Sequence, residues 1–115
     1  MPVRSLTSSI LKWPNKKTVD TAVRRWANKI VQDRQDILRI GYFGSYARGD
    51  WGVGSDLDIV IVVEGTEKPF EMRALNFDTK ELPVPADVLV YTREEWQSDQ
   101  RTFFKTLSAE VRWIY

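Results

Sequence analysis

Two apolar runs separated by a polar, glycine-rich segment constrain the fold of this chain more than any other feature. Residues 37–43 and 57–63 are both predicted to be buried strands. Between them, Gly44-Ser45 ends the first run and opens a short helical turn. Because side chains alternate along a strand, Asp56 and Asp58 project from the same face, a few ångströms apart. The sequence therefore predicts a strand–turn–strand unit in which two carboxylates face a glycine turn.

This unit has the chemistry of a metal and phosphate site. Two neighbouring carboxylates repel each other unless a cation joins them, and Mg²⁺ prefers carboxylate, phosphate and water oxygens. A nucleoside triphosphate would supply the phosphate oxygens. At the turn, Gly44 lets the backbone approach a ligand, and the N–H groups that follow favour an anion. Ser45 adds a hydroxyl donor and Arg48 adds a positive charge.

The motif resembles a known family. Gly-Ser, ten residues and Asp-x-Asp is similar to the motif of the DNA polymerase β-type nucleotidyltransferase superfamily. The fuller strings Gly44-Ser45-Tyr46-Ala47-Arg48-Gly49 and Ser55-Asp56-Leu57-Asp58 resemble its smallest branch, the minimal nucleotidyltransferases. The resemblance covers about residues 18–115 and implies nucleotide binding by Gly44, Ser45, Arg48 and Ser55.

The resemblance also implies a third carboxylate on a neighbouring strand. Asp87 fits, because it is flanked by Ala86, Val88 and Leu89 in an apolar run where an acid needs a partner or a cation. We expect Asp56, Asp58 and Asp87 to be the metal ligands, with two Mg²⁺ ions and ATP as substrate. Asp87 would also take the proton of the attacking hydroxyl. The alternative is that Asp87 ends a strand or pairs with an arginine.

Each residue of the motif also has an ordinary structural explanation. Gly44 could be a simple turn glycine, Ser45 a helix cap, and Arg48 a surface charge, a partner of Asp50 or a support for the loop. Trp51, between glycines, could stack on a base, dock a partner or contribute local packing. The combination at this spacing favours the functional interpretation, because an ordinary turn does not require two carboxylates on the next strand.

Composition excludes several other chemistries. The 115 residues contain no cysteine and no histidine, so thiolate catalysis, disulfides and imidazole metal ligands are absent. Carboxylates with a hard cation are the main chemistry left. We expect one domain over residues 16–115, with residues 1–15 as a tail or docking segment and no room for a second substrate-binding domain. The absence of a long apolar run or a signal-peptide pattern predicts a cytoplasmic protein.

Charge is divided unevenly along the chain. Residues 1–49 contain 10 basic and 3 acidic side chains, whereas residues 50–115 contain 7 basic and 13 acidic ones. The basic half could attract a triphosphate, RNA or an acidic protein surface. Direct nucleic-acid binding has no recognisable module to support it.

The remaining pattern predicts an α+β fold with a small mixed sheet and helices packed on one face, as in the polymerase β-like core. An amphipathic helix is expected over residues 18–35 and a short helix within residues 69–79, with Phe70, Leu75 and Phe77 facing inward. A capping box at Thr92 and Glu95 begins a helix that runs to about residue 108, and residues 110–115 form a last strand.

Minimal nucleotidyltransferases are commonly encoded beside a HEPN-type protein, so the resemblance implies a toxin partner. The expected activity is transfer of AMP from ATP to a hydroxyl of that HEPN ribonuclease, that of a tyrosine, which would make this chain its antitoxin. Two alternatives remain open. One is transfer to a small hydroxylated molecule, and the other is a non-catalytic antitoxin that inhibits by binding alone.

Overall fold

The fold is a four-stranded sheet with helices, here described from a computed structural model that covers residues 13–115. The elements follow the chain in the order α2 (Lys16–Asp33), β1 (Ile37–Phe43), α3 (Ser45–Arg48), β2 (Leu57–Val63), η1 (Phe70–Asn76), β3 (Ala86–Thr92), α4 (Arg93–Ser98), α5 (Thr102–Glu110) and β4 (Arg112–Trp113). Residues 1–12, most of the expected tail or docking segment, lie outside the described residues.

The sheet is mixed, with the strand order β3-β2-β1-β4. β1 pairs antiparallel with both β2 and β4, and β2 pairs parallel with β3. Close packing of β4 depends on Gly41, because a Cβ there would collide with the backbone and side chains of residues 111–113. The α+β class and the mixed sheet are confirmed, and β1 and β2 have the predicted bounds.

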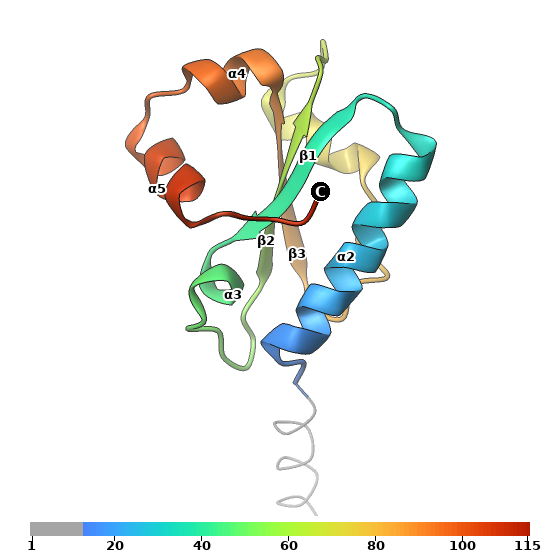
Figure 1. Ribbon diagram of the computed structural model, residues 1–115, viewed down its shortest axis with the longest axis vertical. Helices are drawn as coiled ribbons and strands as arrows, with labels where there is room; N and C mark the ends of the chain where they lie inside the picture. Colours follow the sequence, from blue (N-terminus) through green and yellow to red (C-terminus); the bar gives the residue numbers. More distant parts are fainter. Residues whose placement is uncertain (1–12) are drawn as a thin grey trace, which may run out of the picture.

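Helices cover both faces of the sheet, which corrects the expectation that they pack on one face. Ile59 of β2 belongs to the same core cluster as Val23 of α2, whereas Val60 packs with Leu107 of α5 on the opposite side. Figure 1 shows α2 on one side of the strands and the α4–α5 pair on the other. Because β2 is apolar on both faces apart from Asp58, each face needs its own cover.

The first helix, α2, forms where the sequence predicts it, two residues earlier at each end. Asn15 caps it through a 2.9 Å bond from the Thr18 N–H to its side-chain oxygen. The helix is tied to β1 by the Tyr42 hydroxyl, which donates to Asp20 at 2.8 Å. Burial, together with this bond to the Asp20 carboxylate, raises the pKa of Tyr42 to about 12.

The predicted helix after β3 is interrupted. The capping box of Thr92 and Glu95 is present, as predicted. However, α4 ends at Ser98, and α5 begins only at Thr102. Between them the Asp99 side chain accepts a hydrogen bond from the Arg101 N–H at 2.9 Å. Such a local side-chain bond competes with the helical ladder, which explains the break.

The segment between β2 and β3 forms the 3₁₀ helix η1, and its apolar side chains do not all point inward. Phe77 is buried as expected, but Leu75 is 76% exposed and Phe70 lies at the surface. The buried side chain of η1 is instead Arg73, which donates to both oxygens of Glu95 and to the Val90 carbonyl. This ion pair joins η1 to the start of α4.

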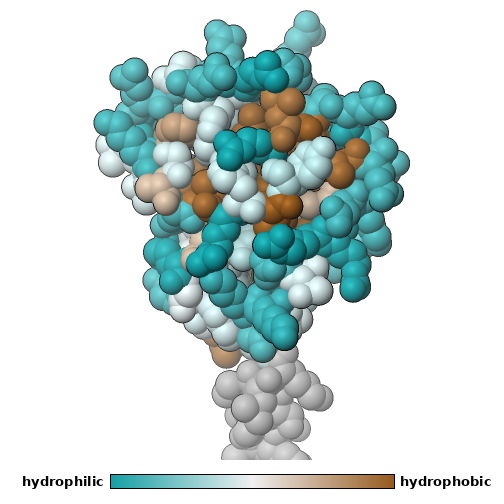
Figure 2. Space-filling model, in the orientation of Figure 1, coloured by the Kyte–Doolittle hydropathy of each residue, from teal (hydrophilic) through white to brown (hydrophobic). Residues whose placement is uncertain are grey.

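The surface is mixed in character. On the face in Figure 2, apolar residues form separate patches among hydrophilic ones. Within residues 13–115, no helix has the length and apolar composition needed to cross a membrane.

Candidate active site

The turn between β1 and β2 is built around Gly44. Its φ of 77° and ψ of −152° lie in a region that is essentially restricted to glycine. A Cβ at this position would also collide with Oδ2 of Asp58, so the carboxylate lies directly against the Gly44 backbone. Gly44 is therefore needed for two reasons, the backbone conformation and the close approach of an acidic side chain.

Asp58 lies near the start of β2, an interior strand of the sheet, close to the other predicted site residues. It pairs with Phe43 on β1 and with Asp87 on β3. Residues in register on adjacent parallel strands project from the same face, so Asp58 and Asp87 share a face. Asp56 precedes β2 and lines the same cavity as Asp58. The fold thus places Asp58 between the other two predicted carboxylates, sharing one cavity with Asp56 and another with Asp87.

The pKa of Asp58 reflects this crowding. Burial is the largest cause that raises it, followed by the negative charges of Asp87 and Asp56. Arg48 acts in the opposite direction, and Glu110 adds a further small increase. Neighbouring negative charges repel the ionised form of this carboxyl and so raise its pKa. A bound cation would offset that repulsion.

Asp87 is less enclosed than the sequence suggested. The expected burial among apolar neighbours is wrong, because Asp87 is exposed at the start of β3, an edge strand. Its neighbours Ala86 and Val88 are only partly buried. The exposed position leaves the carboxylate accessible from solvent, as a group that exchanges protons with a substrate must be.

The donor set suits a hard cation, although the side chains are not gathered around one point. Among residues 13–115, no group of three or more acidic side chains is arranged closely enough to hold a metal ion. Carboxylate oxygens are the ligands that Mg²⁺ selects, and the negative charges of Asp87 and Asp56 raise the pKa of Asp58. Asp56, Asp58 and Asp87 are candidate ligands for a hard cation by their chemistry, and metal binding by them stays a prediction.

Two adjoining cavities meet at Asp58. One, of about 440 Å³, is lined by Gly44, Ser45, Arg48 and Asp56. The other, of about 540 Å³, lies on the Asp87 side and is walled mainly by apolar side chains. Asp58, Phe43 and Phe103 line both cavities. This arrangement places hydrogen-bond donors and a guanidinium on one side of Asp58 and a carboxylate in an apolar setting on the other.

Glu110 is a member of the site that sequence reasoning missed. From the end of α5, its Oε1 accepts a hydrogen bond from the Gly44 N–H at 2.8 Å. Both of its carboxylate oxygens are 3.3 Å from Nη1 of Arg48. Arg48 also donates to Asp50 at 3.1 Å, as one of the structural explanations anticipated. In sequence, Glu110 has no distinguishing pattern, because only the tertiary fold brings it to Gly44.

The other motif residues divide between cavity and loop. Ser45 lines the cavity of about 440 Å³, and nucleotide binding by Ser45 stays a prediction. Ser55 instead accepts a 2.7 Å hydrogen bond from the Gly52 N–H and holds the loop together. Trp51 stacks on Tyr46 with ring centroids 5.6 Å apart, which supports local packing rather than a free recognition surface. Nucleotide binding by Ser55 stays a prediction.

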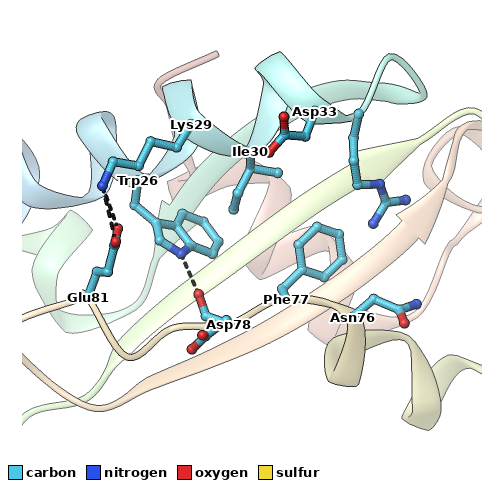
Figure 3. A pocket seen from close by; sticks show the side chains of 9 residues that line it. Trp26, Lys29, Ile30, Asp33, Asn76, Phe77, Asp78 and Glu81 are labelled. Carbon is cyan, nitrogen blue, oxygen red and sulfur yellow. Dashed lines mark hydrogen bonds and ion pairs between the residues drawn. The ribbon is translucent and has the colours of Figure 1, made fainter.

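Another cavity, of about 320 Å³, lies between α2 and residues 76–81, on the α2 side of the sheet. Figure 3 shows Trp26 and Phe77 in its wall, with the Trp26 indole donating to the Asp78 carbonyl at 2.8 Å and Lys29 paired with Glu81. Two of its polar contacts join lining residues to each other, and none of the predicted site residues lines it.

Residues 24–109 match the family profile described as a nucleotidyltransferase domain. The chain belongs to the nucleotidyltransferase domain family. This matched region contains the Gly44 turn, all three aspartates and most of α5. No curated protein sequence matches the chain.

Solved structures with the same fold extend this result. A protein of Sulfolobus solfataricus assigned as a nucleotidyltransferase is 18% identical, with a TM-score of 0.63, over 85% of this chain and 80% of that one. A chain of a toxin–antitoxin complex crystallised with AMP-PNP is 17% identical, with a TM-score of 0.53, over 80% of this chain and 72% of that one. A variant of the toxin–antitoxin complex MntA-HpeT gives 14% identity and a TM-score of 0.50, over 80% and 71%. At these identities the likeness establishes the fold.

Proposed function

We propose that this nucleotidyltransferase domain moves AMP from ATP to a hydroxyl group of a partner protein and thereby acts as an antitoxin. The observation that carries the proposal is the position of Asp58 between two cavities. One cavity has the Gly44 turn, Ser45 and Arg48, and the other has Asp87 within apolar walls. A phosphate donor and a hydroxyl acceptor would approach the same carboxylate from opposite sides.

The donor side suits a triphosphate. The β and γ phosphates would lie at the Gly44-Ser45 turn, where the Ser45 hydroxyl would donate to them. The Gly44 N–H and the Arg48 guanidinium, which are bonded to Glu110 in the free chain, would donate to the phosphates once they exchange that carboxylate for them. Asp56 and Asp58 would hold Mg²⁺ against the phosphates, and Asp87 would share in holding a second ion. When bound, the metal supplies charge neutralisation of the attacking and leaving oxygens.

The acceptor side supports transfer to a hydroxyl. The acceptor oxygen would form a bond to the α-phosphorus as the bond from that phosphorus to the bridging oxygen breaks. Pyrophosphate leaves with the bond electrons, and the hydroxyl proton passes to the carboxylate of Asp87. The raised pKa of Asp58 indicates a crowded negative site, so a metal-free enzyme would bind the triphosphate poorly.

The partner part of the proposal rests on two observations. Two structural neighbours with the same fold are chains of toxin–antitoxin complexes, one of them crystallised with an ATP analogue. The cavity beside Asp87 is also lined by Phe43, Phe77, Leu89 and Phe103, a setting suited to an aromatic acceptor such as tyrosine. We propose a HEPN-type ribonuclease as that partner.

The test is co-expression of this chain with the toxin encoded beside it, followed by intact-mass and peptide mass analysis of the toxin. The proposal predicts a mass increase of one AMP unit on a tyrosine, lost in the Asp56→Asn and Asp58→Asn variants and retained in Asp33→Asn. Asp33 is exposed on α2 and serves as the matched control. An unmodified toxin that is nevertheless silenced would favour inhibition by binding alone.

A further inference from the structure

Glu110 lies where an anion is expected to bind. Its carboxylate accepts the Gly44 N–H at 2.8 Å and contacts the Arg48 guanidinium through both oxygens at 3.3 Å. A backbone N–H at a glycine turn together with an arginine is a combination that recognises phosphate oxygens. A carboxylate also presents two oxygens to these donors, so it resembles part of a phosphate group.

The backbone on both sides of Glu110 is held by hydrogen bonds. On one side, α5 ends at Glu110, with the Val111 N–H bonded to the Leu107 carbonyl. On the other side, Arg112 and Trp113 pair with β1, and Nε of Arg112 donates to the Ala47 carbonyl at 3.1 Å. The side chain is 20% exposed, so a rotamer change would turn the carboxylate toward solvent without unfolding any element.

We propose that Glu110 occupies a phosphate position and that a nucleoside triphosphate must displace it to bind. The inference rests on the proposed function and concerns the same site. A single N–H cannot donate fully to a carboxylate and a phosphate at once, and two anions at one guanidinium repel each other. Glu110 therefore lowers the affinity for the triphosphate and discriminates against weakly held anions.

The alternative role predicts the opposite result. If Glu110 instead positions Gly44 and Arg48 for catalysis, its removal would weaken nucleotide binding. Replacing Glu110 by glutamine keeps the size of the side chain but removes its charge, so the two roles separate in one measurement. Hydrogen bonds to charged groups are worth enough that their loss changes affinity by about tenfold.

The experiment is calorimetric titration of the full chain with Mg²⁺ and an ATP analogue that has a methylene group between the α and β phosphorus, which blocks transfer. We expect Glu110→Gln to bind the analogue about tenfold more tightly than the unchanged chain, with no change for AMP, which lacks the β and γ phosphates. Glu64→Gln, an exposed acid paired with Arg93, is the control and should leave both affinities unchanged.

Weaker or unchanged binding of the analogue by folded Glu110→Gln would overturn the inference while leaving the proposed function standing. No binding by the unchanged chain would instead reject the proposed function and, with it, this inference. Should Glu110→Gln not fold, the Gly44 amide resonance of the unchanged chain gives the answer. It must shift on addition of inorganic tripolyphosphate but not of AMP, and an unaltered resonance at saturating tripolyphosphate would refute displacement.

Discussion

Replacement of Gly44 by alanine tests the close packing between the turn and Asp58. Two costs add at this position. Strain from a non-glycine residue at this φ and ψ costs about 1–3 kcal/mol, and the collision of the new Cβ with Oδ2 of Asp58 adds about 1–3 kcal/mol of overpacking. Alanine also restricts the conformations of the unfolded chain, which raises the free energy of unfolding by about 0.4–1 kcal/mol. The expected loss of unfolding free energy is about 3 kcal/mol, or a fall in Tm of about 12 °C at roughly 4 °C per kcal/mol.

Two other glycines provide matched controls. Gly49 also has a positive φ, of 90°, but a Cβ there meets nothing within 4 Å, so Gly49→Ala should cost only about 1 kcal/mol. Gly52 has neither a positive φ nor a close neighbour, and its alanine variant should lie within about 0.5 kcal/mol of the unchanged chain. Chemical denaturation of the three alanine variants measures their free energies of unfolding, which should fall in the order Gly52→Ala, Gly49→Ala, Gly44→Ala.

The collision itself is isolated by a double-mutant cycle. Asp58→Ala removes the carboxylate that the new Cβ would meet. The double variant should therefore lose about 1 kcal/mol less unfolding free energy than the sum of the two single variants. Nucleotide binding should be lost in Gly44→Ala and kept in Gly52→Ala. Equal destabilisation by Gly44→Ala and Gly49→Ala, or strict additivity in the cycle, would refute the argument that Asp58 packs against Gly44.

Three further predictions concern charges. Since the folded pKa of Tyr42 is raised to about 12 from 10.0, its contribution to stability is complete below pH 10. This contribution, about 2–3 kcal/mol of unfolding free energy, is lost as the pH rises from 10 toward 12. The stability of Tyr42→Phe, measured by unfolding at alkaline pH, should not show this loss. Arg73→Met removes a buried guanidinium and leaves the Val90 carbonyl without its hydrogen bond and the partly exposed Glu95 without its ion-pair partner, so it should cost about 2 kcal/mol in denaturant unfolding. Arg93→Met, in an exposed pair, should cost less than about 1 kcal/mol, and equal losses would contradict the importance of the burial of Arg73. Because the pKa of Asp58 is raised, its ionisation destabilises the fold, so Asp58→Asn should be more stable than the unchanged chain at pH 7. That gain should vanish in acid, where both forms are neutral, and a less stable variant at pH 7 would contradict the electrostatic reasoning.

Local patterns predicted the part of the site that depends on neighbours in sequence. The bounds of β1 and β2 follow from their apolar runs, and the Gly44 turn follows from the residue types between them. Asp87 was found through the family resemblance, yet its exposure was not foreseen. An edge strand leaves its first residues uncovered, and strand order cannot be read from an apolar run.

The errors share one physical origin, which is competition between local pattern and tertiary contact. The helix after Thr92 breaks because Asp99 captures the Arg101 N–H. Leu75 faces solvent because η1 is a 3₁₀ helix that buries Arg73 instead. Glu110 had no local pattern at all, since its role arises from hydrogen bonds to residues more than sixty positions away.

The central claim, that the site transfers a nucleotidyl group, is tested most directly with ATP carrying label at one phosphorus at a time. The full chain is incubated with Mg²⁺, the proposed toxin partner, and either α-labelled or γ-labelled ATP. Label from the α position should reach the protein acceptor, label from the γ position should leave in pyrophosphate, and Asp58→Asn should transfer neither. Transfer of γ label, or α label transferred equally by Asp58→Asn, would contradict the account.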